Sequence, residues 1–65
     1  MWYIVDTKHN HMIDVFSTRE EAQQELDWSL LEGRSVEEGG VDYSVVDWIV
    51  ESEDEYLDRV VSIFF

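Results

Sequence analysis

Residues 41–65 constrain the fold most, because they hold two runs of strand-forming residues with the acidic segment 51–55 between them. β-branched and aromatic side chains dominate both runs, and such residues favour pleated, half-buried strands. Along residues 42–50 both alternating faces carry apolar side chains, which is typical of a central strand or of a strand buried at an interface. We therefore expect this stretch to supply much of the core.

The end of the chain admits two structures. Residues 60–65 are strand-like by propensity, and we favour a fourth strand that pairs antiparallel with the preceding one through a turn at residues 52–55. A helix is the alternative, because Ser52 and Glu55 have the spacing of a capping box. The apolar stripe of that helix would be Tyr56, Val60 and Phe64.

The first half of the chain predicts a hairpin followed by a helix. Residues 2–5 and 12–16 are short strand-forming runs, and a polar turn joins them, in which Asn10 is suited to a left-handed backbone. The helix is expected to end near Glu32, with Gly33 as its left-handed cap. Its start carries two overlapping capping boxes, Ser17 with Glu20 and Thr18 with Glu21. Residues 34–40, which include two glycines, predict a flexible loop.

Helical periodicity gives the predicted helix two apolar sides. One face carries Ala22, Leu26, Ser29 and Leu30, and it is expected to pack on the sheet. Trp28 and Leu31 lie on nearly the opposite side. Either the loop that follows wraps this last turn, or the two side chains form an exposed contact surface, and both interpretations stay open.

These elements give an α+β fold of the order ββαββ, in which an antiparallel sheet carries one helix packed on one face and residues 1–65 form one domain. One helix covers only one face of a sheet, so apolar residues on the other face predict a homodimer or a bound partner. The chain has 65 residues and no cysteine, so no disulfide stabilises it. A domain of this size buries only about 60% of its unfolded surface, which also favours association.

The net charge of −12, from 4 Lys or Arg and 16 Asp or Glu residues, limits the function. Proteins bind nucleic acids and anionic membranes through Lys and Arg residues, which are few in this chain. We therefore expect it to bind neither nucleic acid nor membranes directly. The chain starts without a basic leader before an apolar run, and no apolar run is long enough to span a bilayer. We expect a cytoplasmic protein.

Few residues suggest chemistry. His9 and His11 with an aspartate would be a metal ligand set, but alternate residues of a turn need not converge, and two exposed histidines are expected instead. Asp47 is the only carboxylate placed within an apolar run, which is the environment that a general acid needs. We nevertheless expect its side chain to face solvent from a strand. The sequence contains no nucleotide-binding, serine-hydrolase or zinc-protease motif. We expect no enzyme activity, no metal and no cofactor.

The acidic residues themselves suggest a binding surface. Side chains two apart on a strand lie about 6.6–6.8 Å from each other, which is of the same order as the spacing of phosphates along a DNA strand. Carboxylates on strands and turns can therefore imitate phosphates before a basic, nucleic-acid-binding protein, with Trp48 and Tyr56 as the expected aromatic anchors. The carboxylates predicted to form this surface are Glu37, Glu38, Asp42, Glu51, Glu53, Asp54, Glu55 and Asp58.

In size, acidity, lack of cysteine and aromatic content, the chain resembles phage-encoded DNA-mimic inhibitors. Those proteins block restriction enzymes, CRISPR effectors, uracil-DNA glycosylase or nucleoid proteins. The resemblance is compositional and contains no motif, so it implies no role for any single residue. Residues 14–22 also resemble the strand-to-helix junction of small bacterial and phage ββα-type domains, which is informative about fold alone.

We therefore favour a non-enzymatic binding protein that inhibits a nucleic-acid-binding partner by competition. The alternative is a small structural or assembly domain that self-associates through the uncovered face of its sheet. In that case the acidity would serve solubility or high-salt adaptation.

Overall fold

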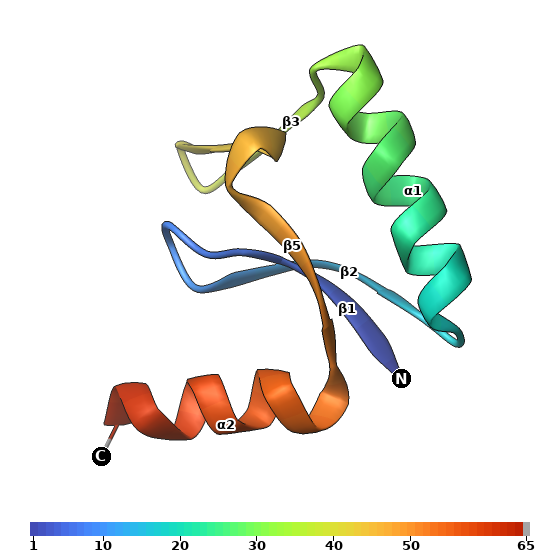
Figure 1. Ribbon diagram of the computed structural model, residues 1–65. Coiled ribbons are helices and arrows are strands. Elements are labelled where there is room, and N and C mark those ends of the chain that lie inside the picture. The colour runs from blue at the N-terminus through green and yellow to red at the C-terminus, as the bar shows by residue number, and fades with distance from the viewer. Residues whose placement is uncertain (65) are drawn as a thin grey trace.

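Antiparallel strands and two helices build the chain, and the computed structural model describes residues 1–64 of it (Figure 1). The side chains of Ile63 and Phe64, and Phe65 as a whole, lie outside the described residues. The predicted α+β class is confirmed. The elements are β1 (Trp2–Asp6), β2 (His11–Phe16), α1 (Arg19–Glu32), β3 (Ser35–Glu38), β4 (Val41–Ser44), the short 3₁₀ helix η1 (Val45–Asp47), β5 (Trp48–Ser52) and α2 (Glu53–Phe64).

The main sheet has three antiparallel strands in the order β2-β1-β5, so β1 is its central strand. The predicted β1–β2 hairpin is confirmed, and Asn10 in its turn has a left-handed φ of 53°. The pairing shifts between Ile4 and Val5 of β1, where β2 carries one extra residue, as in a β-bulge. β1 also pairs along its whole length with β5, from Trp2 opposite Ser52 to Asp6 opposite Trp48.

The prediction of one continuous strand over residues 42–50 is wrong. This stretch divides into the end of β4, the helix η1 and the start of β5, and β5 is an edge strand rather than a central one. The apolar residues on the two alternating faces of this stretch come from β4, η1 and β5 rather than from one strand. The main-chain N–H and the hydroxyl of Thr7 both donate to the carbonyl of Asp47 at 2.9 Å, and these bonds hold η1 against the β1–β2 turn.

The loop predicted over residues 34–40 is instead half of a second hairpin. β3 pairs antiparallel with β4 as a separate two-stranded sheet, and Glu38 and Val41 flank its two-residue turn. Gly39 and Gly40 form that turn with φ values of 59° and 81°. Positive φ at both positions defines the hairpin turn whose twist suits two antiparallel strands, and glycine adopts it without steric cost.

The segment after Ser52 is the helix α2, so the favoured fourth strand is wrong and the helical alternative is confirmed. The hydroxyl of Ser52 accepts from the N–H of Glu55 at 3.2 Å, and the carboxylate of Glu55 accepts from the N–H of Ser52 at 3.2 Å. β-branched residues such as Val60 and Val61 lose only a fraction of a kilocalorie per mole each in a helix. A complete capping box, with acids at the positive helix end, outweighs that loss.

α1 covers one face of the main sheet and begins and ends as predicted. Thr18 caps its start by accepting from the N–H of Glu21 at 3.2 Å, and Gly33 ends it with a left-handed φ of 63°. Ala22, Leu26 and Ser29 are buried, whereas Leu30, predicted on the same face, is half-exposed. The core consists of Ile4, Ala22, Leu26, Val45 and Trp48.

The opposite face of the main sheet is only partly covered. α2 contacts β1 and β5 near their paired ends, and Figure 1 shows it extending from the sheet toward the C-terminus. Met12, Val15 and Ile49 lie on this face, since they are paired with residues of β1 that alternate with the core residue Ile4. All three remain more than one-third exposed. In the described part of the chain, neither helix is long and apolar enough to cross a bilayer.

Candidate functional site

The carboxylates predicted from sequence lie on the β3–β4 hairpin, on α2 and, for Glu51, on β5. Those on the β3–β4 hairpin are Glu37, Glu38 and Asp42, and those on α2 are Glu53, Asp54, Glu55 and Asp58; all are exposed. Glu37, Glu38 and Asp42 lie on strands, but no two of them are two residues apart on the same strand, so the phosphate-like spacing predicted along a strand does not occur among them. On α2, Asp54 and Asp58 lie one turn apart, about 6 Å along the helix axis, and this spacing is similar.

The hairpin places two of its carboxylates directly opposite each other. Glu37 is the cross-strand partner of Asp42 in the β3–β4 register. Like charges in this position destabilise the pairing of two strands. No ion pair within residues 1–64 compensates either carboxylate. The hairpin therefore keeps an electrostatic repulsion that any cationic group from a partner would relieve.

Both histidines help to hold the hairpin against the main sheet. The ring of Tyr43 on β4 stacks on His11 at 4.3 Å between centroids and meets the edge of His9 at 4.9 Å. Each histidine also pairs at 3.2 Å with a carboxylate, His9 with the buried Asp6 and His11 with the exposed Glu38. No group of three or more His, Cys, Asp or Glu side chains able to hold a metal occurs among the described residues. The histidines thus serve packing.

The acids at the start of α2 have structural partners as well as exposure. Glu53 lies 3.8 Å from the N-terminal amino group. The hydrogen bond from the N–H of Ser52, followed by the bond from the Ser52 hydroxyl, lowers the pKa of Glu55 from its ordinary value of 4.5. Carboxylates in a first turn also stabilise a helix through its dipole. Asp54 and Asp58 carry no such partner in the described residues, so they are the α2 carboxylates most available to another molecule.

Trp48 and Glu51, predicted on the binding surface, are buried, and Tyr56 is only partly accessible. Trp48 is 6% exposed within the core and Glu51 is 3% exposed. Glu51 accepts two hydrogen bonds from Arg59 of α2, one from Nε at 2.7 Å and one from Nη2. Tyr56 is half-buried, with its ring 4.8 Å from that of Tyr3. Desolvation, then the charge of Glu53 and the neighbouring Tyr56, raise the pKa of the Tyr3 phenol.

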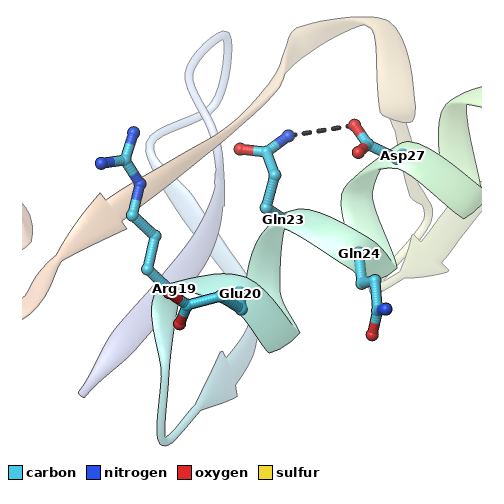
Figure 2. A pocket seen from close by; sticks show the side chains of 5 residues that line it. All are labelled: Arg19, Glu20, Gln23, Gln24 and Asp27. Atoms are coloured by element: carbon cyan, nitrogen blue, oxygen red, sulfur yellow. Dashed lines mark hydrogen bonds between the residues drawn. The ribbon is translucent and has the colours of Figure 1, made fainter.

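A third group of acids lies on the outer side of α1, and the sequence argument missed it as part of the surface. Its exposed members are Glu20, Glu21, Asp27 and Glu32. The signal was present, because helical periodicity places them away from the stripe of Ala22, Leu26 and Ser29. A shallow hollow of about 460 Å³ lies on this helix. Figure 2 shows the side chains that line it, Arg19, Glu20, Gln23, Gln24 and Asp27. In it Gln23 donates to Asp27 at 3.0 Å.

The four cationic side chains leave most of this acidity uncompensated. Arg34 pairs with Glu25 at 2.8 Å, Arg59 pairs with the buried Glu51, and Arg19 lies over the Trp2 ring at 5.7 Å. Lys8 is exposed in the β1–β2 turn. Including the histidines and the N-terminus, ion pairs within residues 1–64 engage five of the 16 carboxylates. The remaining acids give the hairpin, α1 and α2 a surface of one sign.

Asp47, the carboxylate singled out within an apolar run, lies in η1 and is half-buried. Its main-chain carbonyl, rather than its carboxylate, makes the bonds to Thr7 that fix η1. Its position is therefore explained by the fold.

No protein-family model, curated protein or solved structure matches the chain. The charge and geometry of the chain itself are therefore the basis for its function.

Proposed function

We propose that the protein is a non-enzymatic, acidic binding protein that acts in the cytoplasm and occupies the basic nucleic-acid-binding site of a partner protein. The observation that carries the proposal is the uncompensated acidity. A net charge of −12 on 65 residues opposes folding by self-repulsion, and the cations of the chain do little to reduce it. A basic partner removes this repulsion when it binds.

The exposed carboxylates would act first on the rate of association. Charges of one sign steer an oppositely charged partner into encounter, and the effect weakens as salt screens it. Glu37 and Asp42 on the hairpin and Asp54 and Asp58 on α2 are the groups available for this role. Asp54 and Asp58, one helical turn apart, have a spacing of the order that separates phosphates along a nucleic-acid strand. Glu37 and Asp42 face each other across the hairpin and concentrate negative charge at one point.

A pulldown from host lysate tests the proposal. The immobilised protein should retain one stoichiometric nucleic-acid-binding protein, and competing duplex DNA should release it. A smear of basic proteins, or no retained protein, would contradict the proposal.

Charge reversal tests which carboxylates steer the partner. The double variants Glu37→Lys with Asp42→Lys, and Asp54→Lys with Asp58→Lys, should slow association with the retained protein and flatten its dependence on salt. The hairpin variant keeps two like charges opposite each other, so the repulsion within the hairpin is the same as in the natural protein. An unchanged association rate would remove that element from the mechanism.

A second candidate is a small assembly domain that dimerises through the uncovered face of the main sheet. The exposure of Met12, Val15 and Ile49, at 41%, 41% and 37%, favours it. Sedimentation at low and high salt separates the two proposals. A dimer that forms most readily at high salt and is lost in Val15→Glu would support assembly, and a monomer under all conditions would dismiss it.

A further inference from the structure

The end of α1 exposes two large apolar side chains beside each other. Leu31 is 89% exposed and Trp28 is 60% exposed. Residues three apart on a helix are neighbours, so the two side chains form one patch. Leu31 points almost directly away from the stripe of Ala22, Leu26 and Ser29 that α1 buries in the core. The patch therefore faces outward and does not contribute to the core.

The chain that follows α1 does not cover this patch. The N–H of Arg34 donates to the carbonyl of Ser29 at 3.0 Å, and its guanidinium donates to Glu25 at 2.8 Å and to the Ser29 hydroxyl at 3.3 Å. Glu25 and the buried Ser29 lie on the inner side of the helix. The connection to β3 thus leaves α1 on the side opposite to Leu31, and the interpretation in which a loop wraps this turn is wrong.

Acids surround the patch. Asp27 and Glu32 are its exposed neighbours in sequence, and Gln24 and Glu20 continue the line of Leu31 and Asp27 toward the start of the helix. The one cation nearby in sequence, Arg34, is paired with Glu25. The complement of such a surface is an apolar pocket bordered by Lys and Arg. A second copy of the chain is a poor complement, since it would bring acids against acids.

We propose that Trp28 and Leu31 are the apolar anchors through which a basic protein, with an apolar pocket bordered by Lys and Arg, is held on α1. This inference rests on the proposed function, and it supplies the anchors that the burial of Trp48 removes from that function. Exposed Trp residues at the centre of an interface carry a large share of binding energy. The acids raise the rate of association, and the patch lowers the rate at which the complex dissociates.

The test uses a synthetic helical peptide with Leu on one face and Lys on the other, and a control peptide in which Gln replaces every Leu. Calorimetry should show that the Leu–Lys peptide binds more tightly than the control. The indole N–H signal of Trp28 should move in NMR spectra of the intact protein. Trp28→Ala and Leu31→Ala should each weaken binding about thirtyfold, the equivalent of a hot spot of about 2 kcal/mol. Leu57→Ala on α2, where Leu57 is 51% exposed, is the matched control and should change affinity less than about twofold.

The outcomes separate this inference from the function on which it rests. If both peptides bind equally and Trp28→Ala changes nothing, the anchors are wrong and the acidic surface stands. If neither peptide binds, the proposed function fails as well. If the protein is a dimer that Trp28→Ala converts into a monomer, the occupant of the patch is a second copy and the inference is overturned. Circular dichroism of each variant verifies that α1 is intact.

Discussion

α1 and α2 begin in the same way and are attached to the sheet in different ways. In each, the N–H of the residue three positions on donates to the hydroxyl of the cap, Thr18 or Ser52, and each carries an acidic first turn. The Glu55 carboxylate also accepts from the Ser52 N–H and completes a capping box, whereas the Glu21 carboxylate accepts from the Thr18 hydroxyl. α1 then buries Ala22, Leu26 and Ser29 in the core. α2 has no fully buried side chain among its described residues.

α2 is attached mainly by polar and aromatic contacts near its start. Arg59 reaches Glu51 on β5, and Tyr56 contacts Tyr3 on β1. A capping box fixes where a helix begins and does not determine how firmly it is held. Loss of one contact should therefore have different effects in the two helices. In α1 it should destabilise the whole fold, and in α2 it should loosen that helix alone.

The largest expected effect is on α1. Leu26→Ala removes a side chain that is 7% exposed in the core and should lower the free energy of unfolding by about 3 kcal/mol. The free energy of unfolding of a domain of this size is only about 3 to 10 kcal/mol. The sheet and the helices should therefore unfold together, at a lower denaturant concentration than in the natural protein. Urea unfolding followed by circular dichroism and by tryptophan fluorescence measures this.

Leu30→Ala is the matched control for this prediction, because Leu30 is on the same helix and 50% exposed. It should cost less than about 1 kcal/mol. Fluorescence and dichroism transitions that separate in Leu26→Ala would mean that α1 unfolds without the sheet. The contrast with α2 would then be lost.

The next effect concerns the attachment of α2. Arg59→Met keeps the apolar stem of the side chain and leaves the buried Glu51 without its cation. Removing one partner of a fully buried pair costs about 3 to 5 kcal/mol, and since Arg59 is 32% exposed we expect about 2 kcal/mol. Hydrogen exchange should show α2 amides losing protection while β1 and β2 keep theirs.

Two controls sharpen this prediction. Arg34→Met breaks the ion pair between Arg34 and Glu25, in which both side chains are more than 40% exposed. It should lower the free energy of unfolding by less than about 1 kcal/mol. Adding Glu51→Leu to Arg59→Met removes the stranded charge and should restore most of the stability. Equal loss of protection in β1 and α2 would show that α2 is part of one cooperative unit with the sheet.

The sequence predicted the local signals of this fold better than its long-range pairing. The left-handed Gly33 and Asn10 and the Thr18 cap are set by neighbouring residues and are confirmed, whereas the Ser52–Glu55 capping box confirms the helical alternative rather than the favoured strand. The pairing of β5 with β1 joins segments more than 40 residues apart. No local residue pattern specifies which edge of a strand will be used.

The errors at the candidate site have a related cause. Trp48 alternates with Asp47 and Ile49, and only its place opposite Asp6 in the sheet decides that it faces the core. The hairpin turn at Gly39 and Gly40 falls in the predicted loop, because β3 before it has only four residues, two of them acidic. Conversely, the outward position of Trp28 and Leu31 follows from helical period alone. Whether the following chain covers these two side chains depends on its direction after Gly33, and helical period does not specify that direction.

The smallest expected effect is a pH dependence confined to α2. The hydrogen bonds from Ser52 lower the pKa of Glu55, so the folded state binds its proton less readily than the unfolded state. Folding therefore gains stability from Glu55 above the unfolded value of about 4.5, and this contribution is lost as the pH falls through the lower folded pKa. A carboxyl NMR titration should give Glu55 a midpoint below that of an unconstrained glutamate.

Ser52→Ala removes the hydroxyl of the capping box and is the control for this titration. It should move the midpoint of Glu55 part of the way up and leave the bond to the N–H of residue 52 in place. The helicity of α2 should fall with acid more steeply in the natural protein than in Glu55→Gln, while α1 shows no such difference. If Glu55 titrates at its ordinary value in the natural protein as well as in Ser52→Ala, its capping contact does not persist in solution. The start of α2 would then depend on Arg59 and Tyr56, which makes the contrast with α1 sharper.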